Sequence, residues 1–214
     1  MEIQWLGHSA FKLTESTGTS IVTDPFSERV VGYAMPKVSS DIVTISHSHD
    51  DHNAISNVEG NPEVIDSVGS FEIDGVHIYS MTSNHDHHSG SRRGENLIFK
   101  IRMDGVDVCH LGDIGEECSI RLSEAIGAVD VLLIPIGGNY TISAEEAKEY
   151  VDLLMPNVVI PMHYKTRDCT LDIGRLEDFL DLFEDEQVIY VDSSIKFDRS
   201  EFLGEETKIV VFNK

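Results

Sequence analysis

Short apolar runs recur along the whole chain and are separated by polar turn residues. Apolar runs of this kind, bounded by glycine, proline, asparagine and aspartate, are typical of β-strands. They predict strands over residues 3–6, 10–13, 20–23, 42–46, 64–65, 76–81, 97–101, 106–111, 131–136, 158–162, 188–191 and 208–212. Asp74-Gly75 and Asp104-Gly105 each separate two of these runs, and such dipeptides favour tight hairpin turns.

Helical periodicity is concentrated in the second half of the chain. Ser143-Ala144-Glu145-Glu146 is a capping box, and apolar residues then follow at helical spacing until Pro156. A second stripe joins Leu176, Phe179, Leu180 and Phe183, and a weaker pattern predicts a helix over Ile120–Ile126. A strand-rich first half and an alternating second half fit an α/β fold in which helices cover sheets, as one domain over residues 1–214.

Composition narrows the class of protein. The formal net charge is −22, and so acidic a surface disfavours nucleic acid and anionic membranes as partners. No apolar run reaches the length needed to cross a bilayer, and the amino terminus does not resemble a signal peptide. Cys109, Cys118 and Cys169 are widely spaced, which indicates reduced, mostly buried thiols rather than disulfides or a cysteine-based zinc site. We therefore expect a cytoplasmic protein.

Histidine and aspartate residues stand where several predicted strands end. His47 and His49 follow the run 42–46, His85 follows 76–81, Asp113 follows 106–111, and His163 follows 158–162. The carboxyl edge of a sheet is where layered α/β proteins assemble their sites. Four separate segments that bring metal-ligating residue types to one edge are difficult to explain by packing alone.

The run His47-Ser48-His49-Asp50-Asp51-His52 has a spacing that suits metal ions. Residues two apart in extended chain point the same way, so His47 and His49 can share one ion. If the chain then turns into a helix, Asp51 and His52 can present an oxygen and a nitrogen to a second ion. Imidazole and carboxylate ligands together favour zinc, iron or manganese over calcium or magnesium alone.

This run resembles the H-x-H-x-D-H signature of the metallo-β-lactamase superfamily, and the resemblance covers nearly the whole chain. Several further motifs resemble the short metal-dependent hydrolase branch that includes relatives of L-ascorbate-6-phosphate lactonases. They are Trp5-Leu6-Gly7-His8-Ser9, Thr23-Asp24-Pro25-Phe26, Arg93-Gly94-Glu95-Asn96, His110-Leu111-Gly112-Asp113, Ile136-Gly137-Gly138 and Pro161-Met162-His163-Tyr164.

The resemblance implies a four-layer αββα sandwich with two divalent metal ions at one edge. Zinc is the first expectation for these ions, with manganese or iron as alternatives. The first ion would be held by His47, His49 and His85, the second by Asp51, His52 and His163, with Asp113 bridging both. His49 stands where oxygen-reducing diiron relatives usually carry glutamate, which favours hydrolysis.

Several assignments stay open. His85, His87 and His88 could each be the third ligand of the first ion, and we choose His85 because it comes first after the strand. Asp24 resembles the family aspartate that braces the histidine loop, but could be an ordinary turn residue, and His8 could line the groove or close a hairpin. His110 is expected as a core histidine and His77 on a sheet surface. Either a substrate contact or a structural role is possible for each of three further residues: Tyr140, Tyr164 and Lys165.

The resulting hypothesis is hydrolysis of an ester, lactone or phosphodiester of a small, anionic molecule. Two cations that share a water lower its pKa from 15.7 toward about 7, which gives hydroxide at neutral pH. Asp51 could orient that hydroxide or carry a proton. Arg92, Arg93 and Lys165 lie in loops beside the expected ligands and could hold the anion. A diiron oxidoreductase and a non-catalytic metal-binding module are the alternatives.

Overall fold

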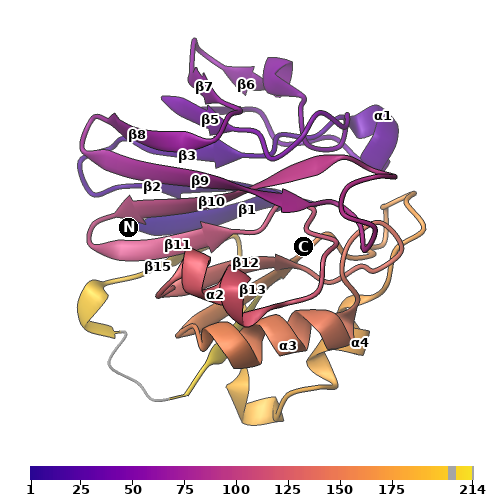
Figure 1. Cartoon of the computed structure of the whole chain (residues 1–214). Helices are drawn as coiled ribbons and strands as arrows, with labels where there is room; N and C mark the ends of the chain where they lie inside the picture. Colours follow the sequence, from indigo (N-terminus) through magenta and orange to yellow (C-terminus); the bar gives the residue numbers. More distant parts are fainter. Residues whose placement is uncertain (202–205, 214) are drawn as a thin grey trace.

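Two β-sheets lie face to face in the computed structural model, which describes residues 1–201 and 206–213 (Figure 1). The first sheet has the strand order β15-β1-β2-β3-β5-β7. Its strands are β1 (Glu2–Gly7), β2 (Ala10–Thr14), β3 (Ser20–Thr23), β5 (Ile42–Thr44), β7 (Glu63–Ile65) and β15 (Ser194–Lys196). Strands β4 (Val38–Ser39) and β6 (Val58–Glu59) pair separately.

The second sheet is larger and has the order β14-β16-β13-β12-β11-β10-β9-β8. Its strands are β8 (Gly69–Ile73), β9 (Val76–Asn84), β10 (Glu95–Met103), β11 (Val106–His110), β12 (Val131–Pro135), β13 (Val158–Met162), β14 (Val188–Val191) and β16 (Lys208–Phe212). Strands β8 to β11 pair antiparallel, whereas β11, β12, β13, β16 and β14 pair parallel.

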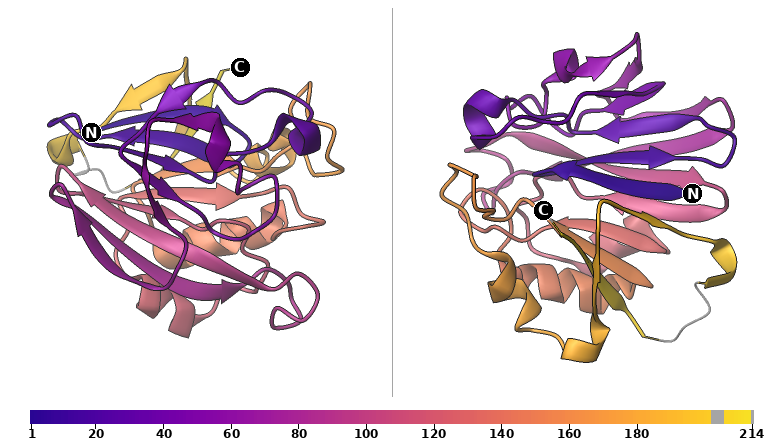
Figure 2. Two further views of the ribbon diagram at one scale, coloured as in Figure 1. Left: turned by 90° about the horizontal axis from the view of Figure 1, so that it is seen from above. Right: turned by 180° about the vertical axis from the view of Figure 1, so that it is seen from behind.

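Helices cover both outer faces of the two sheets, as the view from above also shows (Figure 2). The face of the larger sheet carries α2 (Ile120–Ile126), α3 (Ala144–Leu154) and α4 (Leu176–Leu180). The smaller sheet is covered by the single turn α1 (Glu28–Val31) and neighbouring loops. Short 3₁₀ turns complete the chain at Ile55–Asn57, Asp185–Gln187 and Arg199–Glu201. The arrangement is the predicted αββα sandwich, with one thin outer layer.

Three apolar clusters hold these layers together. The central one lies between the sheets and includes Phe11, Ile78 and Phe99, which are fully buried or nearly so. A second lies under the helices and includes Tyr150 and Phe179. Burial of apolar surface is the main stabilising contribution in such layers. Polar side chains at the strand ends are therefore held by a rigid support.

The predicted turns and helices are largely confirmed. Both hairpins form two-residue turns in which the aspartate and the glycine have positive φ, 49° and 86° at Asp74-Gly75 and 50° and 75° at Asp104-Gly105. The capping box at Ser143 is present, and α2 covers the predicted residues.

One local expectation was wrong, and one condition stated for the histidine run is not met. Helix α4 ends at Leu180, so Phe183 follows the helix, although its ring still packs against Phe179 at 4.9 Å between centroids. The segment after β5 forms turns rather than a helix, closed by a hydrogen bond from the His52 N–H to the His49 carbonyl. None of the helices in the described part of the chain is long and apolar enough to cross a membrane.

Candidate metal centre

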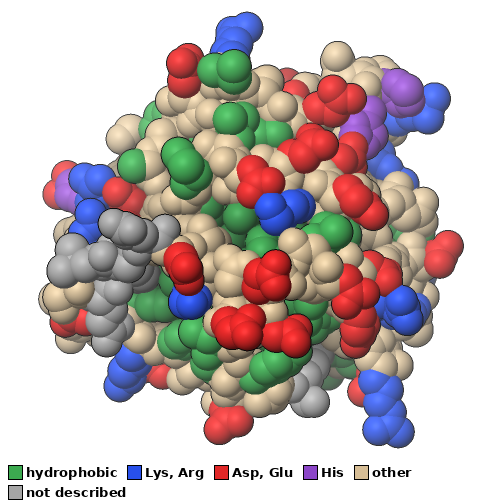
Figure 3. Space-filling model, turned by 90° about the horizontal axis from the view of Figure 1, so that it is seen from below, with side chains coloured by type: hydrophobic (Ala, Val, Ile, Leu, Met, Phe, Trp, Pro, Cys, Tyr) green, Lys and Arg blue, Asp and Glu red, His purple; other side chains and the backbone are tan. Residues whose placement is uncertain are grey.

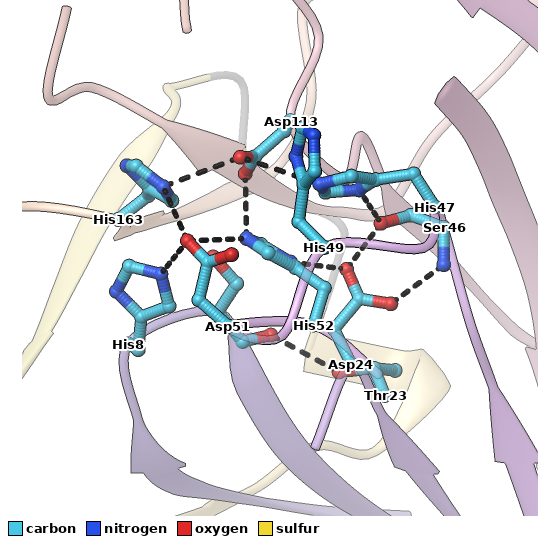
Figure 4. A network of polar contacts seen from close by, with 12 residues as sticks. His8, Thr23, Asp24, Ser46, His47, His49, Asp51, His52, Asp113 and His163 are labelled. Atoms are coloured by element: carbon cyan, nitrogen blue, oxygen red, sulfur yellow. Dashed lines mark hydrogen bonds and ion pairs between the residues drawn. The ribbon is translucent and has the colours of Figure 1, made fainter. Parts of the chain in front are cut away.

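All seven predicted ligands gather at one edge of the sandwich, and Figure 4 labels each of them except His85. The loop after β5 supplies His47, His49, Asp51 and His52. Three strands of the larger sheet end at this edge, and each supplies one further residue directly after its end or a few residues later: His85 after β9, Asp113 after β11 and His163 after β13. The sheet edge predicted from the sequence is therefore the place where the polar residues meet.

The first cluster consists of His47, His49 and His85, whose ligand atoms all lie within 4.8 Å of one another. The His85 Nε2 atom lies 3.2 Å from the His49 Nδ1 atom and 3.5 Å from the Asp113 Oδ2 atom. The ring centroids are 4.5 to 5.1 Å apart. Three imidazoles thus face a common point beside a carboxylate.

The second cluster contains Asp51, His52 and His163, together with His8, again within 4.8 Å. Asp113 lies between the clusters, with its Oδ1 atom 3.1 Å from His52 Nε2 and its Oδ2 atom 3.3 Å from His163 Nε2. The Asp51 Oδ2 atom is 3.6 Å from His52 Nε2 and 4.0 Å from His163 Nε2.

These separations suit ligands that share a metal ion. Ligands of a tetrahedral zinc ion at about 2.0–2.2 Å lie about 3.3–3.6 Å from each other, whereas hydrogen-bonded nitrogen and oxygen atoms are usually nearer to about 2.9 Å. Among the described residues, several buried atoms here have no hydrogen-bond partner, including Nε2 of His47, His52 and His163. Buried polar atoms are normally paired, so the donor set fits metal ions.

The charges of Asp113 and His47 are consistent with this fit. Burial alone would raise the pKa of Asp113, but His163 and His52 outweigh burial and hold it well below its ordinary value. Burial, together with the nearby His52, lowers the pKa of His47 to about 3. The carboxylate is therefore ionised and the imidazole neutral at pH 7, which are the forms that bind metal ions.

Asp24 braces the histidine loop, as the resemblance implies. Its carboxylate accepts a hydrogen bond from the Ser46 N–H at 2.8 Å and another from the Ser46 hydroxyl at 2.5 Å. The Asp24 Oδ2 atom also contacts His52 Nδ1 at 2.9 Å, and the Ser46 hydroxyl lies 2.9 Å from His47 Nδ1. Asp24 thus orients one imidazole directly and another through Ser46. Such contacts fix the ring that faces a metal.

Asn96 and Gly112 place Asp113. Both stand in motifs of the resemblance, but no role was expected for either of them. The Asn96 Oδ1 atom accepts the Asp113 N–H at 2.8 Å, and its amide donates to the Leu111 carbonyl at 2.9 Å. A Cβ atom on Gly112 would lie 2.3 Å from Asn96 Oδ1 and 2.6 Å from the Ser46 Cβ atom. Only glycine permits this close approach between the Asp113 loop and the histidine loop.

The structure separates the three neighbouring histidines after β9. The His85 ring is buried in the first cluster, whereas His87 and His88 are exposed. Asp86 shapes the loop, because its carboxylate accepts the backbone N–H groups of four residues: His88, Gly90, Arg92 and Arg93. These bonds lower the pKa of Asp86 to about 2 against the opposing effect of burial. The geometry favours the choice of His85.

The remaining candidate residues of the sequence analysis have contacts that show their surroundings. His110 is a buried core histidine, with Nε2 2.9 Å from the Ser9 carbonyl, and His77 lies exposed on β9. Tyr164 is buried and stacked on Trp5 at 5.6 Å. The Lys165 ammonium donates to the Leu171 carbonyl at 2.5 Å. Tyr164 and Lys165 therefore have structural contacts.

A cavity of about 780 Å³ opens beside the first cluster, lined by His49, His85, Arg92, Arg93 and Tyr140 among others. The Arg93 guanidinium stacks over the Tyr140 ring at 4.5 Å, a cation–π contact. Arg93 and Tyr140 also line a second hollow with His49, Asp51, His85 and Asp113. A positive group therefore stands next to the candidate metal centre.

Comparison with known proteins agrees with the fold. Residues 2–163 match the family model of the β-lactamase superfamily domain. A UPF0173 metal-dependent hydrolase of Thermococcus onnurineus is 32% identical over 194 residues, which cover 78% of this chain and 85% of that protein. The chain belongs to this family of metal-dependent hydrolases, within the metallo-β-lactamase superfamily.

Solved structures of the family share the architecture. A crystal structure from Thermotoga maritima, described as a Zn-dependent hydrolase of the metallo-β-lactamase superfamily, has a TM-score of 0.81 and 39% identity. The match covers 99% of this chain and 97% of the Thermotoga maritima chain. Igni18, a metallo hydrolase of Ignicoccus hospitalis, has a TM-score of 0.60 and 27% identity over 77% of this chain and 82% of its own.

Proposed function

We propose that this enzyme hydrolyses an ester, lactone or phosphodiester of a small anionic molecule at a two-metal centre. The observation that carries the proposal is the pair of imidazole clusters on either side of Asp113. His47, His49 and His85 would hold one ion, and Asp51, His52 and His163 the other, with Asp113 shared. Zinc is the first choice, supported by the Zn-dependent description of the Thermotoga maritima relative. Manganese and iron remain alternatives.

When bound, the ions supply Lewis acidity that polarises a carbonyl or phosphoryl oxygen and lowers the pKa of water. The chain supplies position and proton handling. Asp24 and Ser46 fix the orientation of two imidazoles. Asp51 is ionised, because the nearby His52 lowers the pKa of its carboxyl against the opposing effect of burial. We assign to that carboxylate the orientation of the attacking water and acceptance of its proton.

The substrate class follows from the cavity. Arg92 and Arg93 line it, and among the described residues neither forms an ion pair with a carboxylate. A guanidinium can bind a carboxylate or phosphate through two parallel hydrogen bonds. Lys165, which the sequence analysis also suggested for anion binding, donates a hydrogen bond to the Leu171 carbonyl instead. We therefore assign anion binding to Arg93, with Arg92 beside it.

The proposed location is the cytoplasm. Cys109, Cys118 and Cys169 are all free thiols, and reduced cysteines are characteristic of reducing compartments. We propose a small-molecule substrate in that compartment.

Metal content tests the proposal. Protein purified without chelator should contain close to two transition-metal equivalents per chain by elemental analysis, as two-metal sites require. Asp113→Asn should lower both metal content and hydrolysis across a panel of phosphodiesters, lactones and thioesters, because this residue faces both clusters. A folded protein that contains no metal and gains no activity from added zinc or manganese would contradict the proposal.

The neighbouring histidines provide a matched control. His85→Ala should reduce metal content in the way that His49→Ala does, since both rings face one point. His87→Ala should have little effect, because the His87 side chain is 45% exposed and lies near Glu146. The opposite order would move the third ligand to the exposed loop.

A further inference from the structure

His8 lies in the second cluster although the ligand set proposed above does not include it. It stands in the turn between β1 and β2 of the smaller sheet, and its side chain is 0% exposed. Its Nε2 atom lies 3.5 Å from the Asp51 Oδ2 atom. Figure 4 shows its ring directed at Asp51, on the side of His163.

The positions of the rings are those of a third imidazole around one point. The centroids of His8, His52 and His163 are 4.3, 5.3 and 5.6 Å apart. In the first cluster, the corresponding separations between His47, His49 and His85 are 4.5, 4.6 and 5.1 Å. The two triangles are similar in size. The distances from the His8 ring to the rings of His52 and His163 therefore resemble those from the His47 ring to the rings of His49 and His85.

Neither ring nitrogen of His8 makes a well-formed hydrogen bond among the described residues, and the contact printed for Nε2 is the one to Asp51 Oδ2 at 3.5 Å. A buried imidazole without a closer partner loses its hydration with little compensation. Neutral imidazole with a free nitrogen is a common metal ligand.

The backbone at His8 is held in an unfavourable conformation. Its φ is 51°, in the left-handed region that residues other than glycine rarely adopt. The His8 N–H donates to the Tyr33 hydroxyl at 2.9 Å, and its carbonyl accepts the Trp5 indole N–H at 3.1 Å. A turn that served only to close the hairpin would be more stable with glycine or asparagine at this position.

We infer that His8 Nε2 is an additional ligand of the second metal ion, beside Asp51, His52 and His163. The inference rests on the two-metal centre proposed above. It makes each ion the partner of three imidazoles, and it ties the β1–β2 turn of the smaller sheet to His163, which follows β13 of the larger sheet.

Cadmium NMR tests this directly. The protein with ¹⁵N-labelled histidine is loaded with ¹¹³Cd, because scalar coupling between the two nuclei passes only through a metal–nitrogen bond. We expect three coupled imidazole nitrogens at each of two cadmium signals. His8→Gln should leave the three coupled nitrogens of one cadmium signal unchanged and reduce the number of coupled nitrogens at the other signal to two. It should also weaken binding of one metal equivalent by more than the roughly 10- to 100-fold seen when an outer-sphere contact is lost.

His110→Gln is the matched control, because His110 is another buried histidine outside the clusters. It should leave both couplings intact. Two coupled nitrogens at one cadmium in the unmodified protein would overturn the inference, and this measurement does not depend on how a variant folds. So would a His8→Gln variant that keeps all couplings. Failure of the unmodified protein to bind cadmium or zinc would instead overturn the two-metal proposal itself.

Discussion

Asp24 shows at the residue scale how one buried carboxylate can organise the site. It is 0% exposed, has φ of 39°, and is placed by the end of β3 beneath the histidine loop. Its two oxygens are shared between Ser46 and His52. An asparagine of the same shape could accept only at one atom, so the His52 ring would lose its charged partner.

We therefore predict that Asp24→Asn lowers affinity for one metal equivalent by about 10- to 100-fold, measured by competition with a chelator. Asp41→Asn is a close control. Asp41 accepts the N–H and hydroxyl of Ser20 much as Asp24 accepts those of Ser46, but lies at the other end of β3. Equal effects of the two substitutions on metal affinity would show that Asp24 acts through stability alone.

Residues that carry their own chemistry could be predicted from the sequence, and the bracing role of Asp24 could be predicted from the resemblance, whereas the roles of Ser46 and Asn96 could not. His47, His49 and His52 stand in one short run after a strand, so their convergence follows from the chain itself. Ser46 and Asn96 gain their roles only from contacts across the fold, with Asp24 and with the Asp113 loop. A single sequence does not contain those contacts, and the side of the turn to which the His8 ring points is set by packing.

At the element scale, the strands and hairpins were predictable where a local rule decides. Both Asp-Gly dipeptides form the turns expected of them, since aspartate and glycine accept positive φ. Strand β8 was missed because its apolar residues, Phe71 and Ile73, are few and flanked by polar ones. Helix α4 was predicted too long because its apolar stripe continues to Phe183 beyond the last helical turn.

The hairpin at Asp104 allows the contribution of one carboxylate charge to the stability of the fold to be tested. The Asp104 carboxylate binds the amino terminus of Met1 at 3.0 Å and accepts the Ser16 hydroxyl at 2.6 Å. Burial would raise the pKa of Asp104, but Ser16 and the amino terminus outweigh it and lower the pKa. A lowered folded pKa adds stability above the unfolded value, near 3.9, and this stability is lost as the pH falls through the folded pKa.

We predict that Asp104→Asn lowers the free energy of unfolding by about 0.2–1 kcal/mol at pH 7, and that the difference shrinks toward pH 3. Asparagine preserves the turn, so urea unfolding at both pH values isolates the charge. Asp74→Asn, in the equivalent turn, should show no such dependence, because Asp74 forms no ion pair within the described residues. A pH-independent loss at position 104 would mean that the carboxylate contributes only through neutral hydrogen bonds.

Over the whole molecule, negative charge dominates and makes the few positive groups near the site conspicuous. The net charge is −22, and the helix-covered face carries carboxylates spread among apolar side chains (Figure 3). Exposed acidic residues of α3 and α4 contribute to it, among them Glu145, Glu149 and Glu177. Such a surface repels a long polyanion, whereas a small anion needs to contact only the cavity that Arg93 lines.

The last prediction concerns the effect of the Arg93 charge on substrate binding in the cavity. Arg93→Ala should raise KM for anionic substrates by about tenfold, as loss of a hydrogen bond to a charged group implies, while KM for neutral esters of matched size changes little. Arg121→Ala removes the same charge from the exposed surface of α2 and controls for the long-range field. RNA longer than a few nucleotides should bind weakly at physiological salt, because most of its phosphates would face carboxylates. If Arg93→Ala reduced the hydrolysis of charged and neutral substrates equally, the arginine would be a support for Tyr140 rather than the anion-binding group, and the substrate would not need to be an anion.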